Sequence, residues 1–104
     1  MSARDIDDAP TAIRIKAADN VATLTAAAEA GQGVGVVGVA GPQRLVALDD
    51  IPRGHKIAVS DIAQGAEIVK YGEPIGEATC AVRAGEWVHV HNCRGLRARR
   101  FADI

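Results

Sequence analysis

Apolar residues in this chain occur in short runs that end at glycines or alternate with polar positions. At the first run, Ile13 and Ile15 alternate with Arg14 and Lys16, a pattern typical of a short, half-buried strand. The later runs are rich in valine and isoleucine, which favour strands over helices. They read VATLT, VGVVGV, RLVAL, KIAV, AEIVKY, EATCAV and WVHVH. The pattern predicts six to eight short strands and an all-β domain.

A glycine spacing repeats four times and divides these runs. An apolar residue, two others, a glycine, two more and a second apolar residue recur at 28–34, 51–57, 62–68 and 82–88. The glycines are Gly31, Gly54, Gly65 and Gly85. Each is predicted to take a positive φ in a turn between two strand segments, because glycine alone adopts that conformation without steric cost.

Helical segments are expected to be minimal. The alanine-rich stretch at 26–30 is too short to hold a helix by itself before Gly31. Residues 60–63 form the one plausible helical turn, with Ser60 as its N-cap. The predicted fold therefore contains at most one or two short helical turns.

Length and composition add limits to this prediction. The 104 residues suit one domain, divided into a loose leader at 1–11, a folded part at 12–95 and a basic tail at 96–104. A net charge of -1 gives no sign of nucleic-acid or membrane binding, and no apolar stretch approaches the roughly 20 residues that span a bilayer. The acidic, polar start MSARDIDDAP does not resemble a secretory signal. We expect a cytoplasmic location.

The two cysteines, Cys80 and Cys93, are too few and too irregularly placed for a disulfide framework. Reduced thiols are the expectation in the cytoplasm. Cys80 is predicted to be a small buried apolar residue.

Gly33, Gly35 and Gly38 have the GxGxxG spacing of a dinucleotide-binding loop. That motif needs a helix after it, whose N-terminus faces the pyrophosphate. Here Gly41-Pro42 stands where the helix would run. A strand whose glycines permit sharp bending or close backbone approach is the better interpretation.

A basic cluster near the C-terminus contains Arg94, Arg97, Arg99 and Arg100. An anionic partner or substrate is one interpretation. A solvated tail, or an edge that meets acidic residues of a partner chain, is favoured. No aromatic residues are interleaved to support single-stranded nucleic acid.

All three histidines lie between residues 55 and 91. His89 and His91 are predicted to share one strand face, because side chains alternate with a period of two. They could chelate a divalent metal or line a substrate cleft; the alternative is a solvent-facing strand with Val88 and Val90 packed inside. His55, just after a turn glycine, is suited to meet a ligand or to be an exposed loop residue.

Lys56 and Lys70 could supply positive charge to an anionic ligand, although each alone would be an ordinary surface residue. No Asp, Glu and His residues have the spacing of a complete metal site. A chain this small also offers little depth for a water-excluding pocket. A catalytic role would therefore mean covering or completing a site built by another chain.

Three segments closely resemble one enzyme family. They are DNVATL at 19–24, IPRGHKIAVSDIAQGAEIVKYGEPIG at 51–76 and AGEWVHVHN at 84–92, and the likeness covers most of 12–95. GHKIA, KYGEPIG and HVHN together resemble the small subunit or N-terminal domain of altronate and galactarate dehydratases, a group that includes sulfolactate sulfo-lyase small subunits. The resemblance implies a SAF-type β-clip of folded hairpins, similar to type III antifreeze proteins and the C-terminal domain of sialic acid synthases.

The resemblance also implies β-elimination from a hydroxy acid, with iron(II) or manganese in a large catalytic part. This chain looks like a separate accessory subunit, with no metal of its own unless His89 and His91 bind one. His55, His89 and His91 are the candidate catalytic residues, and Lys56, Lys70 and Asn92 the candidate substrate contacts. The expected partners are the large subunit, a sugar acid such as altronate or galactarate, and a possible second copy of the chain. The alternatives are a sulfolactate sulfo-lyase subunit and a non-catalytic sugar-acid-binding module.

Overall fold

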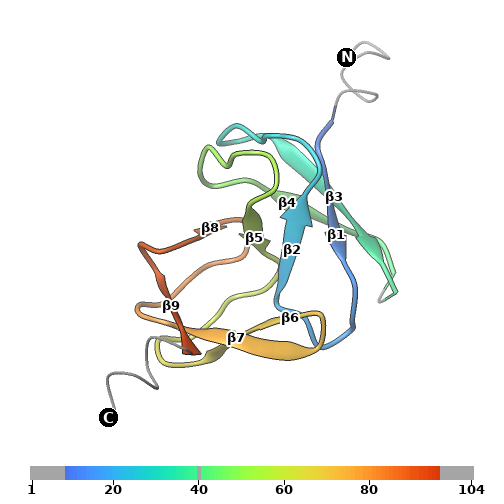
Figure 1. Ribbon diagram of the computed structural model, residues 1–104. Helices are drawn as coiled ribbons and strands as arrows, with labels where there is room; N and C mark the ends of the chain where they lie inside the picture. Colours follow the sequence, from blue (N-terminus) through green and yellow to red (C-terminus); the bar gives the residue numbers. More distant parts are fainter. Residues whose placement is uncertain (1–8, 40, 97–104) are drawn as a thin grey trace.

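The computed structural model describes residues 9–39 and 41–96, which form nine short strands in two sheets (Figure 1). The strands are β1 (Thr11–Arg14), β2 (Val21–Leu24), β3 (Gly33–Gly38), β4 (Gln43–Val46), β5 (Lys56–Ala58), β6 (Glu67–Lys70), β7 (Glu73–Ala78), β8 (Trp87–Val88) and β9 (Cys93–Gly95). The all-β prediction is confirmed, with one strand more than its upper count. Residues 1–8 of the expected leader and 97–104 of the expected tail, including Arg97, Arg99 and Arg100, lie outside the described residues.

The larger sheet has the order β4-β3-β1-β2-β5-β8, and the smaller has the order β6-β7-β9. All neighbours are antiparallel except β1 and β3, which run parallel. The smaller sheet lies below the lower ends of β2 and β5 in Figure 1. Asn20 ties the two together: its amide oxygen accepts from the Val69 backbone, and its amide nitrogen donates to the Glu67 carbonyl.

Two apolar cores share the central strands. On β5, Ile57 packs into the first core and its neighbour Ala58 into the second, because side chains alternate across a strand. The first core contains Ala12, Ala22, Leu24, Ala28, Val34, Val36, Ala47, Ile51, Ile57 and Val59. The second contains Val21, Ala58, Ile62, Ile68, Ala78, Val82 and Val88. The strands β2 and β5 are therefore buried on both faces.

The four repeated glycine turns are confirmed. The φ angles of Gly31, Gly54, Gly65 and Gly85 are 90°, 83°, 84° and 97°. In each turn the residue after the glycine donates a backbone hydrogen bond to the residue three positions before it. A positive φ at the third position of such a turn is what type II geometry requires.

The helical turn expected at 60–63 is wrong. Ile62 instead forms an isolated β-bridge with Val82, with backbone hydrogen bonds in both directions. Next to it, the Asp61 carboxylate accepts a hydrogen bond from the Ala84 backbone. The long-range bridge is favoured over a local helical turn because it buries the side chains of Ile62 and Val82 in the second core.

The first strand forms as predicted, but it buries small rather than large side chains. Ala12 is fully buried, whereas Ile13 and Ile15 are 41% and 40% exposed. Strand β1 lies between β2 and β3 in the larger sheet. Of its side chains, only the small Ala12 belongs to the first core.

The GxGxxG segment is a strand, as the sequence interpretation favoured. It forms β3 and continues through a turn into antiparallel β4. Gly38 (φ 148°) lies so close to β1 that a Cβ there would come within 1.8 Å of the Arg14 carbonyl oxygen. Close backbone approach therefore explains this glycine. Within residues 9–39 and 41–96, no helix has the length and apolar character needed to cross a membrane.

Candidate functional site

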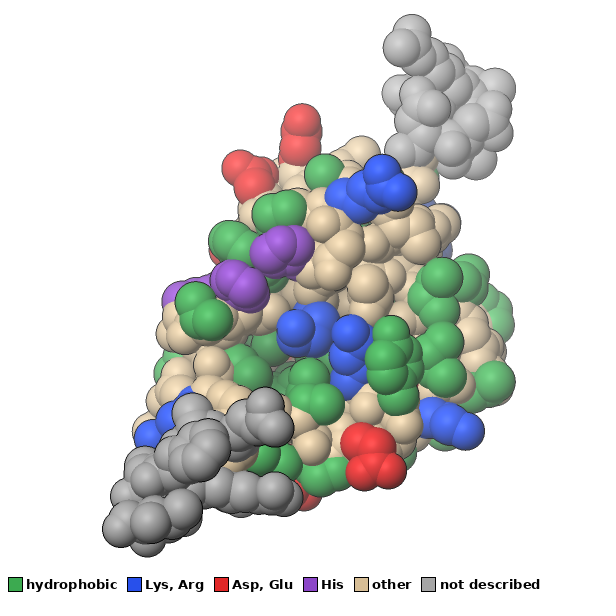
Figure 2. All heavy atoms as spheres, viewed as in Figure 1, with side chains coloured by type: hydrophobic (Ala, Val, Ile, Leu, Met, Phe, Trp, Pro, Cys, Tyr) green, Lys and Arg blue, Asp and Glu red, His purple; other side chains and the backbone are tan. Residues whose placement is uncertain are grey.

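The three histidines gather around the single tryptophan of the chain. The Trp87 ring stacks nearly parallel on His89, with centroids 5.3 Å apart and planes 6° apart. Trp87 also contacts His91 at 5.3 Å and His55 at 5.5 Å, and the His55 and His89 rings are 4.8 Å apart. We call these four residues the imidazole cluster. In Figure 2 the histidine side chains lie together along one edge of the visible face.

Strand pairing brings the cluster together from segments more than thirty residues apart. His55 is the last residue of the second glycine turn and directly precedes β5. The register between β5 and β8 pairs Lys56 with Val88 and Ile57 with Trp87. Continuing that register by one residue places His55 opposite His89, which explains the contact between their rings.

A hydrogen bond fixes the orientation of His55. The Trp87 Nε1–H group donates to His55 Nδ1 at 3.2 Å. An indole N–H only donates, so Nδ1 must be the unprotonated acceptor. In the neutral ring the proton is then on Nε2, which leaves Nε2–H available to donate to a ligand.

His89 and His91 are presented by a turn, so the expected strand at 87–91 is wrong. Strand β8 ends at Val88, and the Asn92 backbone donates to the His89 carbonyl at 3.0 Å. Val90 is 80% exposed rather than packed inside. The two imidazoles nevertheless both contact Trp87, because the turn folds His91 back toward it.

Asn92, a candidate substrate contact, is 3% exposed and holds this turn. Its side-chain oxygen accepts from the His89 backbone at 2.9 Å, and its amide nitrogen donates to the Trp87 carbonyl at 2.8 Å. Both ends of the amide are engaged within the chain. In this structure Asn92 therefore positions Trp87 and His89.

The surroundings of His89 disfavour a positive charge on its ring. Partial burial lowers the pKa of His89, and the nearby His55, Lys56 and His91 lower it further in that order. A neutral His89 is therefore favoured near neutral pH. Across the described residues, no group of three or more His, Cys, Asp and Glu side chains is arranged to hold a metal ion.

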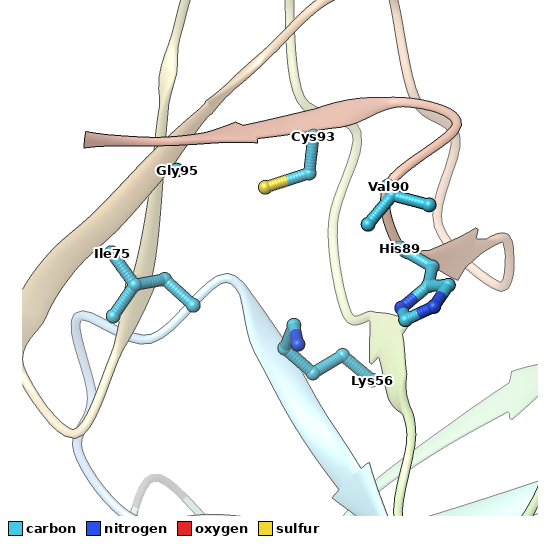
Figure 3. A pocket seen from close by; sticks show the side chains of 6 residues that line it. All are labelled: Lys56, Ile75, His89, Val90, Cys93 and Gly95. Atoms are coloured by element: carbon cyan, nitrogen blue, oxygen red, sulfur yellow. The ribbon is translucent and has the colours of Figure 1, made fainter. Parts of the chain in front are cut away.

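A hollow of about 260 Å³ opens beside His89. Its lining residues are Lys56, Ile75, His89, Val90, Cys93 and Gly95. Figure 3 shows Lys56 extending from β5 into this space, with the Cys93 sulfur pointing into it from β9 and Ile75 on the opposite side. Ile75 and Cys93 pack against the second core, so the hollow continues outward from it.

The remaining sequence candidates lie elsewhere or differ from expectation. Lys70 does not line the hollow; its Nζ lies 4.8 Å from the centre of the Tyr71 ring. Cys80 is exposed, so its predicted burial is wrong. Burial raises the pKa of the Cys93 thiol, and the positive charge of Lys56 partly offsets this effect.

Sequence reasoning missed Trp87 and Cys93 as parts of the site. A signal for Trp87 was present, since it is the only tryptophan and stands two residues before His89. Cys93 follows the HVHN motif directly but shows no local feature that distinguishes it from Cys80. Only the pairing of β9 with β7 places its thiol in the hollow.

The described residues thus form an all-β domain that carries the imidazole cluster on its surface. The model of the altronate/galactarate dehydratase SAF domain matches residues 10–96. The chain therefore belongs to that family, as the resemblance of its motifs indicated.

Relatives with curated names fall into two groups. The chain is 45% identical to altronate dehydratase of Escherichia coli over 82 residues, which are 79% of this chain and 16% of the relative. It is 45% identical over 49 residues to (2R)-sulfolactate sulfo-lyase subunit alpha of Chromohalobacter salexigens, covering 47% of this chain and 52% of that subunit. For the same subunit of Paracoccus pantotrophus it is 43% identical over 54 residues, covering 52% and 81%. The chain thus spans about a sixth of the dehydratase.

Proposed function

We propose that this chain is the accessory subunit of a hydro-lyase that dehydrates a sugar acid such as altronate or galactarate. The reactive centre would lie in a separate large chain, and this domain would cover it. The observation that carries the proposal is the imidazole cluster, in which a fixed tautomer of His55 and an uncharged His89 are in contact. Homology to dehydratases and to a named sulfo-lyase subunit supports the class.

The chemistry of elimination suits these side chains. Removing water from a hydroxy acid breaks a C–H bond beside the carboxylate and a C–O bond at the next carbon, so a base and an acid are both needed. His55 Nε2–H would donate a hydrogen bond to the departing hydroxyl, while Trp87 holds the other ring nitrogen. The base that takes the C–H proton and the acid that protonates the hydroxyl would belong to the large chain. His91 is exposed beside them and contributes a further imidazole to substrate contact.

We place the divalent metal of such a lyase, iron(II) or manganese, in the large chain. When bound, it would stabilise the negative charge that develops on the substrate carboxylate. The described part of this chain offers no set of three ligands for it. No step through the metal is therefore assigned to residues of this domain.

Sulfite release from sulfolactate is the second candidate, favoured by the two sulfo-lyase subunit alpha relatives. Both reactions eliminate a group from the carbon next to an acidic C–H position. Product analysis distinguishes them: a dehydratase complex releases a keto-deoxy acid and no sulfite, whereas a sulfo-lyase complex releases sulfite.

The test is reconstitution of the chain with its co-purified large partner, followed by assays on altronate, galactarate and sulfolactate. His55→Ala and His91→Ala are each expected to lower kcat at least about tenfold, since a hydrogen bond to a group that gains charge is worth about 1.5–3 kcal/mol. Arg83→Ala is the control. Arg83 is exposed, and among the described residues its side chain bonds only to Glu86, which lies in the same turn. Unchanged kinetics in both histidine variants would contradict the proposal.

Folding must be separated from chemistry in the His55 variant. His55→Gln retains a side-chain oxygen that accepts the Trp87 Nε1–H bond, but it lacks the imidazole ring and its Nε2–H donor. We expect this variant to keep the wild-type Trp87 fluorescence and to lose activity as the alanine variant does. Full activity of His55→Gln would show that His55 only supports Trp87.

A further inference from the structure

We infer that the hollow beside the imidazole cluster is a binding site for one carboxylate group of a hydroxy acid, with Lys56 as its cation and His89 as its polar neighbour. This inference rests on the proposed function and extends it, because it divides the surface into an anion-binding part and a part that donates hydrogen bonds to the leaving group. His89 belongs to both parts, since it lines the hollow and contacts His55 and Trp87.

The first hollow is lined by one positively charged side chain and by no negatively charged one. Lys56 is the only lysine or arginine among the lining residues, and no aspartate or glutamate is among them. Within 9–39 and 41–96, Lys56 makes no side-chain hydrogen bond or ion pair. An ammonium held half-buried without a counter-ion attracts an anion more strongly than one in open solvent.

A second hollow on the same molecule gives the contrast. It has about 340 Å³ and is lined by Gln64, Gly65, Glu77, Ala78, Thr79 and Arg94. There the Arg94 guanidinium already pairs with the Glu77 carboxylate. Its cation is satisfied within the chain, whereas that of the first hollow is available.

Apolar side chains form much of the wall of the first hollow. Ile75 and Val90 lie on two sides of the first hollow, and the half-buried Cys93 thiol forms part of it. Burial raises the pKa of Cys93, so the thiol is neutral near pH 7 and adds no competing charge. These side chains reduce the water around Lys56, which strengthens its interaction with a bound anion.

Size and position define how much of a ligand fits. Pockets for drug-sized molecules have about 300–1,000 Å³. A hollow of about 260 Å³ therefore suits one end of a sugar acid. The other end would extend past His89 toward His55, whose ring centre lies 4.8 Å from that of His89.

The chain contains its own reporter for this site. A ligand beside Lys56 would cover the Cys93 sulfur, whereas the exposed Cys80 does not line the hollow. Alkylation of each cysteine by iodoacetamide, followed by mass spectrometry on the full chain, measures both rates in one sample. We expect about 5 mM galactarate to slow Cys93 about fivefold and to leave Cys80 unchanged, as for a weak site with a Kd of about 1 mM.

Two matched controls test the charge. Galactitol has the hydroxyl pattern of galactarate without its carboxylates, and we expect it to give no protection. Lys56→Met keeps most of the length of the side chain without its charge and should abolish the protection by galactarate. Lys70→Met removes a lysine outside the hollow, and in this variant galactarate should still protect Cys93. Rates are compared with and without ligand for each variant, because removing Lys56 also changes the pKa of Cys93.

A second measurement does not depend on the cysteine. A bound carboxylate favours the charged imidazole, so galactarate should raise the pKa of His89 in a proton NMR titration. Equal protection by galactitol, or unchanged Cys93 rates together with an unchanged His89 titration, would overturn the inference. Neither assay needs the large partner, so failure here leaves the lyase proposal standing, and failure of lyase reconstitution leaves this site standing.

Discussion

At the residue scale, Asp19 shows how one buried carboxylate organises two loops. It is 4% exposed, and its oxygens accept backbone hydrogen bonds from Lys16 at 3.0 Å and Gly72 at 2.7 Å. Burial alone raises the pKa of Asp19, but hydrogen bonds from four backbone groups, Gly72 foremost, together lower it below the ordinary 3.8. The carboxylate also supports the positive φ of Tyr71 (57°) and Gly72 (74°) in the β6–β7 hairpin.

Replacing Asp19 should therefore destabilise the fold in a pH-dependent way. A folded-state pKa below the unfolded value gives stability that is present above about pH 4 and is lost as the pH falls through the folded pKa. Asp19→Ala is expected to cost about 1–3 kcal/mol in the free energy of unfolding by urea at pH 7. The difference from wild type should shrink at about pH 2–3.

The control for this prediction is Asp19→Asn, which keeps one oxygen acceptor but places an amide where the second oxygen was. It should lie between wild type and Asp19→Ala at pH 7. A wild-type advantage that is the same at about pH 3 as at pH 7 would contradict the role of the ionised carboxylate.

At the element scale, the repeated glycine turns decide where strands begin and end. Each turn glycine donates its backbone N–H to a carbonyl of another segment; Gly85 donates to Ala58, and Gly54 to Leu24. The turns therefore fix strand pairing as well as chain direction. The second of them delivers His55, and the fourth leads into Trp87, so two copies of one local motif build the imidazole cluster.

Alanine at two of these glycines should give clearly different losses. At Gly65 a Cβ would have no neighbour within 4 Å, so Gly65→Ala costs only the left-handed backbone conformation, about 1–2 kcal/mol. At Gly85 the Cβ would lie 2.2 Å from the Val46 carbonyl oxygen, so steric overlap adds about 1–3 kcal/mol. Thermal and urea unfolding of both variants measure the difference, and equal losses would show that the β4 backbone moves away freely.

At the scale of the whole molecule, the two cores are joined through strands that belong to both. Ile57 and Ala58 on β5 pack into different cores, as do Val21 and Leu24 on β2. If either core came apart, β2 and β5 would lose the packing on one of their two faces, which would also weaken the other core. We therefore expect the domain to unfold as one cooperative unit.

This cooperativity can be measured with the single tryptophan. Trp87 packs against the first core, whereas Ile68 is fully buried in the second. Ile68→Ala should cost about 2–5 kcal/mol and shift the Trp87 fluorescence transition in urea together with the far-ultraviolet circular dichroism. Val39→Ala, at a site 75% exposed, should change neither by more than about 0.5 kcal/mol. Separate transitions for the two probes would show that the cores fold independently.

Local sequence patterns predicted part of the imidazole cluster and its surroundings, but not all of it. The positive φ of Gly54 and the strand start at Lys56 follow from residues within one turn, so the position of His55 at a turn was predictable. Asn92 was expected to contact substrate, yet it is buried and bonded to Trp87 and His89. Its role depends on how the chain folds back after Val88, and this is not encoded in the alternation of neighbouring side chains.

The amino-acid sequence by itself determined the all-β class, the four glycine turns and the family motifs. These features depend on conformational preferences within a few residues, above all on the positive φ that glycine tolerates. Only the tertiary structure decided that Trp87 contacts all three histidines, that Cys93 rather than Cys80 is half-buried, and that Lys56 has no counter-ion among the described residues. Those outcomes depend on pairing between segments distant in the chain, where the burial of apolar surface in two cores selects one register and excludes the rest.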